Sequence, residues 1–339
     1  MGSFISRKVD RRKFLFSWIL LGILTTMLLP FFHGTFFSII FSLLLSVSLG
    51  LGLPASLSFI AESTVADERG RVSGIIILST FAMTFGTLIL AKILSLSLME
   101  TILLSAGLRS ASLLAFVLDR FVEKKEVNRL RLQRGVYKNF LFYLLPWVMF
   151  NIASGLALAL IPANYAEAVA NGTTVRNLFL ALFGLTSGFV ADRYGRKQII
   201  IVGLLILGAG FMLLGFVISP ESVFVYLTTS GIAYGLFFVV FLAVPGDLSS
   251  PSSREKFYAM GTILPLTILF SLYLFPPAFL STYPASTISQ VLSLILFLSI
   301  LPVLKAKETL PASIMRLRKI REHIIKVTKL AQESKKAES

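Results

Sequence analysis

The sequence predicts an all-α polytopic membrane protein with about ten transmembrane helices, and three features point to it: composition, blocks of apolar residues and the placement of basic residues. Hydrophobic residues make up 55% of the chain, charged residues only 14%, and the mean hydropathy is +0.83. A soluble domain is charged at roughly a quarter of its positions. So few charges cannot cover the surface of a soluble protein with this apolar content.

The apolar residues fall in runs that are long enough to cross a bilayer. About 20 residues rising 1.5 Å each span roughly 30 Å of hydrocarbon, where backbone groups must be satisfied within a helix. We predict ten spans, at about 14–32, 37–61, 72–91, 96–118, 139–162, 174–191, 198–217, 223–245, 258–279 and 285–304. Proline, glycine, serine and charged residues occupy the intervals between them.

Basic residues are concentrated in alternate intervals between these spans. One set of intervals, which includes both ends of the chain, holds nearly all of them, whereas the other holds Lys92 and, at the edge of a span, Arg176. The positive-inside rule then predicts a multi-pass protein of the inner or plasma membrane with both termini in the cytoplasm. Because topology explains the net charge of +15, we expect membrane lipids as partners and no nucleic acid.

The longest internal interval divides the chain into two unequal parts. We predict a partial helical bundle of four spans at 1–118, a basic cytoplasmic linker at 119–138, a six-helix bundle at 139–304 and a basic cytoplasmic tail at 305–339. Apolar residues at helical spacing in the tail favour an amphipathic helix on anionic lipid. A solvated charged tail fits the same residues almost as well.

Several chemistries are excluded by composition. The chain has no cysteine and two histidines, which argues against disulfides, thiolate metal sites and histidine-rich metal sites. It has no phosphate-binding Gly-Lys-Ser/Thr loop, and no carboxylate pair or Ser/His arrangement lies at one membrane depth. We therefore expect neither an enzyme with catalytic residues nor a cofactor.

The two parts of the chain contain a repeated pattern at an offset of about 185 residues. Glu62 precedes Arg69 by seven positions near the end of the second span, and Asp247 precedes Arg254 by seven near the end of the eighth. Two copies of a helical unit are typical of transporters built from repeated halves. The same offset places the start of the first half about 46 residues before Met1, so we expect this half to lack its first two helices.

A short motif lies between the second and third spans of the six-span part. Residues 188–197 read GFVADRYGRK, which resembles the G-x-x-x-D-R-x-G-R-[RK] signature of the major facilitator superfamily. Residues 61–71 resemble a loop of its sugar- and metabolite-porter branch, and an eroded copy of the signature lies at 3–13. The resemblance implies a fold of two helical bundles and secondary active transport of a small solute by alternating access, with proton or ion coupling left open.

The resemblance also implies a cytoplasmic gate. Its motif residues are Gly188, Asp192, Arg193, Gly195, Arg196 and Lys197, and the expected partners are Glu62, Arg69, Asp247 and Arg254. A carboxylate at a helix end can accept hydrogen bonds from a neighbouring helix N-terminus, and arginine binds carboxylates through a fork of N–H groups. We expect Asp192 beside the start of the third span, around Arg71 and Val72, and Arg196 beside Asp247. A solvated basic loop explains Arg193 and Lys197 equally well.

Four residues inside the spans are candidates for a solute cavity: Arg109, Trp147, Asn151 and Tyr234. Arginine within a span is a functional candidate, although pairing with backbone carbonyls explains it as well. Trp147 and Asn151 share a helix face, where packing is the equal alternative.

The sequence also leaves open a function other than transport. The missing helices and the eroded motif fit a non-transporting relative that acts as a sensor or partner, or the product of a decayed gene. Phe85-Gly86-Thr87 stands where drug antiporters of the superfamily carry a glycine-proline signature, which counts mildly against drug/proton exchange.

Overall fold

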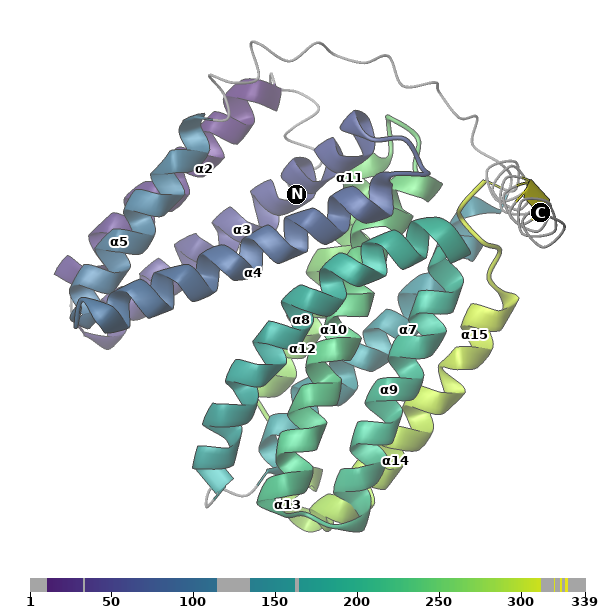
Figure 1. Ribbon diagram of the computed structural model, residues 1–339. Coiled ribbons are helices and arrows are strands. Elements are labelled where there is room, and N and C mark those ends of the chain that lie inside the picture. The colour runs from purple at the N-terminus through teal and green to yellow at the C-terminus, as the bar shows by residue number, and fades with distance from the viewer. Residues whose placement is uncertain are drawn as a thin grey trace, which may run out of the picture.

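Figure 1 shows the computed structural model of the chain, which describes residues 11–32, 34–114, 135–161 and 165–311, with 320, 324, 327 and 328 of the tail. Every regular element in these residues is a helix, as the sequence predicts. We name the helices before the 115–134 gap the N-terminal group. They are α2 (Arg11–Leu28), η1 (Leu29–Phe31), α3 (Thr35–Ser63), α4 (Arg69–Ile93), α5 (Leu98–Ser110) and η2 (Ala111–Leu113).

The helices after that gap form the C-terminal group. They are α7 (Val136–Ala157), η4 (Leu158–Leu160), α8 (Ala166–Tyr194), α9 (Arg196–Phe216), α10 (Pro220–Leu248), α11 (Arg254–Tyr258), the π-helical turn η6 (Ala259–Ile263), α12 (Leu264–Leu274), α13 (Phe279–Thr282), α14 (Ala285–Leu298) and α15 (Ile300–Lys305). The predicted linker lies outside the described residues up to position 134.

Eight helices among the described residues are long and apolar enough to cross a membrane. The other two predicted spans are helical as well, but one is short and one is interrupted. Helix α5 has 13 residues, and α11, η6 and α12 follow one another with a π-helical turn between them. The predicted polytopic all-α fold is confirmed, and the π-helical turn explains why the span at 258–279 escapes a search for uniform helices.

Helix α8 begins eight residues earlier than the sequence predicts, at Ala166 and not near 174. The polar stretch Asn171-Gly172-Thr173-Thr174 looks like a loop in the sequence, yet it continues the helix. Gly172 is buried where α8 packs against Leu227 of α10, and the Thr174 hydroxyl donates to the backbone carbonyl of Ala170 at 3.3 Å. Tertiary packing therefore overrides the local turn signal.

The two groups meet at one end and separate toward the other, as Figure 1 shows. The first residues of α4 meet the last turns of α8 and α10 at the end that we call the basic end, because Arg69, Arg71 and Arg196 lie there. Farther along α4 the side chains are exposed, with Met83 58% and Ile93 73% accessible. Contact between the groups is thus concentrated at the basic end.

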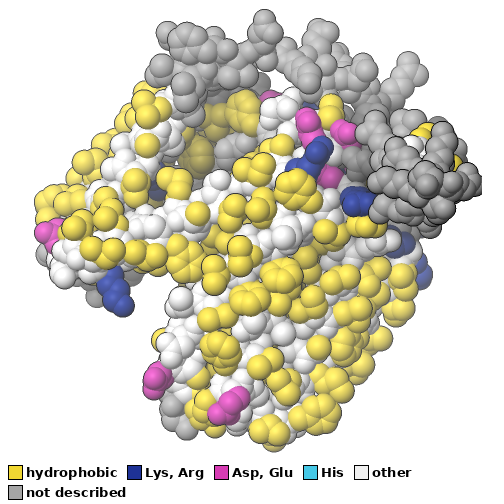
Figure 2. Space-filling view, viewed as in Figure 1, with side chains coloured by type: hydrophobic (Ala, Val, Ile, Leu, Met, Phe, Trp, Pro, Cys, Tyr) yellow, Lys and Arg dark blue, Asp and Glu magenta, His cyan; other side chains and the backbone are white. Residues whose placement is uncertain are grey.

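The outer surface of both groups is apolar. Figure 2 shows hydrophobic side chains over the length of both groups, charged side chains near the basic end and at the opposite tips, and a notch between the groups on the side away from the basic end. Charged side chains are costly in hydrocarbon, whereas apolar ones are not. This surface therefore suits contact with lipid over the middle of the helices.

Candidate functional site

Asp192 joins α8 to the first turn of α4. Its carboxylate accepts hydrogen bonds from the backbone N–H groups of Gly70 at 2.9 Å and Arg71 at 2.8 Å. The first N–H groups of a helix have no partner within the helix and lie at the positive end of its dipole. The Arg71 guanidinium adds an ion pair with Nε 3.3 Å from Asp192 Oδ2. The sequence analysis expected Asp192 beside the start of the third predicted span, which is α4, and this contact is present.

Two glycines allow this contact. A Cβ atom on Gly188 would lie 2.5 Å from the carbonyl oxygen of Gly70, and one on Gly70 would lie 2.7 Å from that of Gly188. Both distances are shorter than a carbon–oxygen contact allows, so the two backbones cross where neither side has a side chain. Close helix approach through small residues is a common way for membrane helices to pack.

Arg196 is completely buried and connects three segments at the basic end. Its guanidinium forms ion pairs with Asp192 at 2.9 Å and with Asp247 at 3.2 Å. It also donates to the carbonyl oxygens of Ala191 at 2.8 Å and Ala66 at 2.6 Å. Because Ala66 lies between α3 and α4, this single side chain links the two groups.

Two further ion pairs cross between the groups in a reciprocal way. Arg69 of the N-terminal group pairs with Asp247 of the C-terminal group, and both side chains are buried. Arg254 of the C-terminal group lies 4.0 Å from Glu62 of the N-terminal group. Each arginine of the two repeated pairs in the sequence therefore pairs with the carboxylate of the other copy. We name the set Asp192, Arg196, Arg69, Asp247, Glu62 and Arg254 the basic-end network.

The other two basic residues of the motif play smaller parts. Arg193 is exposed, with its guanidinium 5.4 Å from the ring of Tyr194. Lys197 donates through Nζ to the carbonyl oxygens of Leu304 at 2.6 Å and Ala306 at 3.2 Å. Lys197 therefore fastens the end of α15 to the start of α9.

The first residues of the predicted tail contact the basic-end network, and the sequence analysis did not predict this. The Glu308 carboxylate accepts from the backbone N–H groups of Arg196 at 2.9 Å and Lys197 at 3.1 Å, and so caps α9. The Thr309 hydroxyl donates to Asp247 at 2.9 Å. The available signal was that Glu308 is the first carboxylate after the last span, among basic residues.

We expect Glu308→Ala to lower the free energy of unfolding by about 1 kcal/mol, the usual cost of losing a helix cap. Thermal unfolding of the purified protein in neutral detergent measures this. Glu167→Ala, at the exposed start of α8, is the matched control and should shift the midpoint less. Equal midpoints for the two variants would contradict the capping role.

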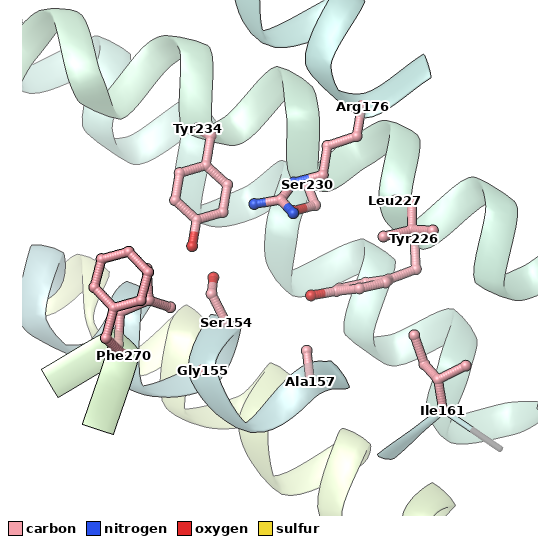
Figure 3. Close-up of a pocket in the computed structure, with 11 residues that line it drawn as sticks. Ser154, Gly155, Ala157, Ile161, Arg176, Tyr226, Leu227, Ser230, Tyr234 and Phe270 are labelled. Atoms are coloured by element: carbon pink, nitrogen blue, oxygen red, sulfur yellow. The ribbon is translucent and has the colours of Figure 1, made fainter. Parts of the chain in front are cut away.

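A pocket of about 200 Å³ lies inside the C-terminal group, away from this network. Ser154, Gly155 and Ala157 of α7, Ile161, Arg176 of α8, Tyr226, Leu227, Ser230 and Tyr234 of α10, and Leu269 and Phe270 of α12 line it. Figure 3 shows the guanidinium of Arg176 between the rings of Tyr234 and Tyr226. Tyr234 is the one cavity candidate from the sequence among these lining residues.

Trp147 lies in the core of the C-terminal group and does not line the pocket. Its ring stacks on Phe241 with centroids 4.9 Å apart, and its indole N–H donates to the carbonyl oxygen of Gly261 at 2.8 Å. Four residues farther along, Pro265 has no N–H to give that carbonyl. Trp147 therefore satisfies a backbone group that the helix itself leaves open.

The remaining two candidates also lie outside the pocket lining. Asn151 is buried and donates to the carbonyl oxygen of Trp147 at 2.7 Å. Arg109 of α5 lays its guanidinium against Gly22 of α2, and its Nη1 is 3.5 Å from the Thr26 hydroxyl. Arg109 thus packs between two helices of the N-terminal group.

Similarity to known sequences is local. No family model matches the chain. An uncharacterised MFS-type transporter of Methanocaldococcus jannaschii is 33% identical over 96 residues, 27% of this chain and 24% of that protein. The multidrug resistance protein MdtH of Yersinia enterocolitica is 31% identical over 86 residues, 25% of this chain and 21% of that protein. The matched segments thus span about a quarter or less of these relatives' length.

Similarity to solved structures extends over most of the chain. The proton:xylose symporter XylE matches with a TM-score of 0.69 and 14% identity, over 91% of this chain and 82% of that one. The Escherichia coli fucose:proton symporter FucP matches with a TM-score of 0.66 and 12% identity, over 90% and 86%. Identities this low establish a shared fold and say nothing of the solute. The chain is therefore an all-α polytopic membrane protein with the fold of the major facilitator superfamily of transporters.

Proposed function

We propose that this protein moves a small solute across the plasma membrane by alternating access, as a secondary active transporter. The observation that carries the proposal is the basic-end network. It joins the two helix groups by buried ion pairs at one end, while the groups separate toward the other end. This is the arrangement of one of the two states that alternating access requires, closed on one side and open on the other.

The basic end is proposed to face the cytoplasm. Loops rich in lysine and arginine remain on the cytoplasmic side of membrane proteins. The described conformation then corresponds to an outward-facing state with its cytoplasmic gate shut. In the same orientation both termini lie in the cytoplasm.

Ion pairs suit a contact that must break and re-form. Taking two charges out of water costs several kcal/mol each, and their attraction roughly repays this when the geometry is good. When the groups rock apart and water enters, hydration replaces the lost attraction. Gating by Asp192, Arg196 and their partners can therefore switch with a small net change in free energy.

The test is solute flux in proteoliposomes that contain the full chain. Sugars, amino acids, monocarboxylates and lipophilic cations are offered with and without an imposed pH gradient. Two similar structures are of proton:sugar symporters, so a proton gradient is the first driving force to apply. We expect gradient-driven uptake of at least one class. A folded protein that moves none of them would overturn the proposal and favour a sensor or partner role.

We expect Asp192→Asn to weaken closure at the basic end by about tenfold. The amide keeps one acceptor for the α4 N-terminus but loses the charge that pairs with Arg196 and the helix dipole. Because the chain has no cysteine, Ser73→Cys introduces a single thiol near the start of α4. Ser73 is buried in the closed state, so the alkylation rate of this thiol reports opening. Glu167→Gln removes an equal charge from the other end of α8 and should leave the rate unchanged. Equal rates in the two variants would argue against a gate at Asp192.

A further inference from the structure

We infer that Arg176 and the pocket around it bind the carboxylate of a small organic anion with an apolar or aromatic body. This inference rests on the proposed transport function, because it names the class of solute. It concerns the pocket inside the C-terminal group and not the basic-end network. Arg176 and Asp192 lie on the same helix, 16 residues apart, so the pocket is about 24 Å along α8 from the network.

Arg176 is a cation without a counter-charge. In the part of the chain that the structure describes, its guanidinium forms no ion pair or hydrogen bond, and its Nε is buried without an acceptor. Its guanidinium lies over the ring of Tyr234, whose centroid is 4.8 Å from Cζ. Native proteins rarely leave a buried N–H group without an acceptor, and an unpaired charge at membrane depth is costlier still. The missing acceptor is supplied when an anion binds.

Arg176 lies too far along α8 to be a residue of the membrane–water boundary. It is the eleventh residue of α8, so about 15 Å of helix separates it from the start at Ala166. An arginine this deep commonly extends its side chain toward the interface. Here the guanidinium stays among the rings of α10, as Figure 3 shows.

A tight helix crossing fixes the base of this side chain. Gly231 of α10 lies so close to the backbone of Arg176 that a Cβ atom there would overlap the Arg176 carbonyl. Gly235 makes a similar approach to α8 one turn later, with a Cβ distance of 2.7 Å to the Gly184 nitrogen. The helix that presents Arg176 is therefore held rigidly against α10, as a binding site requires.

The rest of the lining fits one carboxylate on an apolar body. The hydroxyl groups of Ser154 and Tyr234 point toward each other in Figure 3, and both can hydrogen-bond to a ligand in the pocket. Phe270, Leu227 and Leu269 supply apolar walls. A guanidinium fork matches the two oxygens of a carboxylate, and one cation balances one negative charge.

The same features disfavour other solutes. The lining residues include no aspartate or glutamate to attract a cationic drug, and no second cation for a dianion. Sugars need polar partners on every side, whereas most of the surface of this pocket is apolar. The volume of about 200 Å³ is below the roughly 300–1,000 Å³ of pockets for drug-sized ligands, so the solute or its bound part is small.

Benzoate is the probe for this site, with benzamide as its neutral counterpart of the same shape. Equilibrium binding of radiolabelled benzoate is measured on the purified full chain in neutral detergent at fixed salt. We expect saturable binding at least tenfold tighter than that of benzamide, because charge-assisted hydrogen bonds are stronger than neutral ones. Phthalate, a dianion, should compete less well.

Variants assign the binding to Arg176. Arg176→Gln should weaken benzoate binding about tenfold or more, and Arg176→Lys should recover part of it. Lys92→Gln removes the same charge at the exposed end of α4 and should have no effect. If Arg176→Gln does not fold, Tyr234→Phe keeps the ring, removes the hydroxyl that faces the pocket and should weaken binding by a smaller factor.

Each outcome decides the inference. Unchanged benzoate affinity in Arg176→Gln would overturn it, as would benzamide binding as tightly as benzoate. Phosphatidylglycerol that displaces benzoate at low mole fraction, while benzoate alone does not saturate, would assign Arg176 to a lipid headgroup and also overturn it. Binding without flux in proteoliposomes would leave the anion site standing and remove the transport proposal. Flux of a neutral solute that is unchanged in Arg176→Gln would support the transport proposal and overturn the anion site.

Discussion

Arg196→Ala is expected to destabilise the folded protein by about 3–5 kcal/mol, the usual cost of removing one partner of a buried ion pair. Arg196 is 0% exposed and pairs with both Asp192 and Asp247. Its removal leaves two buried carboxylates with one cation fewer and empties the space that the side chain fills. Unfolding of the purified protein in neutral detergent, followed by helical circular dichroism, measures the loss.

The neighbouring residue of the same motif provides the control. Arg193 is exposed, so Arg193→Ala removes an equal charge from the same turn and should change stability by no more than about 0.5 kcal/mol. The double variant Arg196→Ala/Asp192→Asn should recover part of the loss, because it also removes one of the stranded charges. Similar unfolding of the two single arginine variants would show that the basic-end network does not hold the groups together.

Gly188→Ala is expected to force α8 and α4 apart at their crossing. The new Cβ atom would lie 2.5 Å from the Gly70 carbonyl oxygen and 3.2 Å from the Arg71 Cα, and neither backbone atom can rotate away. Overpacking of this kind costs about 1–3 kcal/mol. The cost applies to the closed basic end alone, so the population should shift toward an open basic end by about tenfold or more.

Alkylation of the single thiol in Ser73→Cys, which is buried while the basic end is closed, measures this shift, and transport should fall with it. Gly86→Ala is the matched control, because a Cβ atom at Gly86 of α4 has no atom within 4 Å. A faster alkylation rate for Gly188→Ala than for Gly86→Ala is the expected result. Equal rates would mean that the helices cross more loosely than the described backbones indicate.

The sequence by itself determined the class of fold and pointed to the residues of the basic-end network. Runs of apolar residues define the helices because hydrocarbon leaves backbone groups no partner except their own helix. The resemblance of residues 188–197 to a known motif implied that Arg196 lies beside Asp247 and Asp192 beside the start of the third span, and both contacts are present. Charged residues are costly within hydrocarbon and gather at helix ends, so their positions mark the end of the helices at which the gate lies.

Glu308 and Trp147 took their roles from contacts that no local pattern encodes. Glu308 caps a helix that begins 112 positions earlier in the chain, and Trp147 donates to a carbonyl 114 positions later. Local spacing reports which residues share a helix face, but not which other helix that face meets. Hydropathy therefore placed Glu308 in a tail and left Trp147 undecided between cavity and core.

Arg176 shows the limit of hydropathy most clearly. The polar residues before it suggested a loop, which put the arginine at a boundary, whereas packing of Gly172 against α10 extends α8 by eight residues and places Arg176 deep inside. Lipid tails are as apolar as a leucine side chain, so hydropathy cannot separate a lipid-facing position from one that faces another helix. The sequence decided which segments are helices, and only the tertiary structure decided which faces meet and which polar groups are left for a ligand.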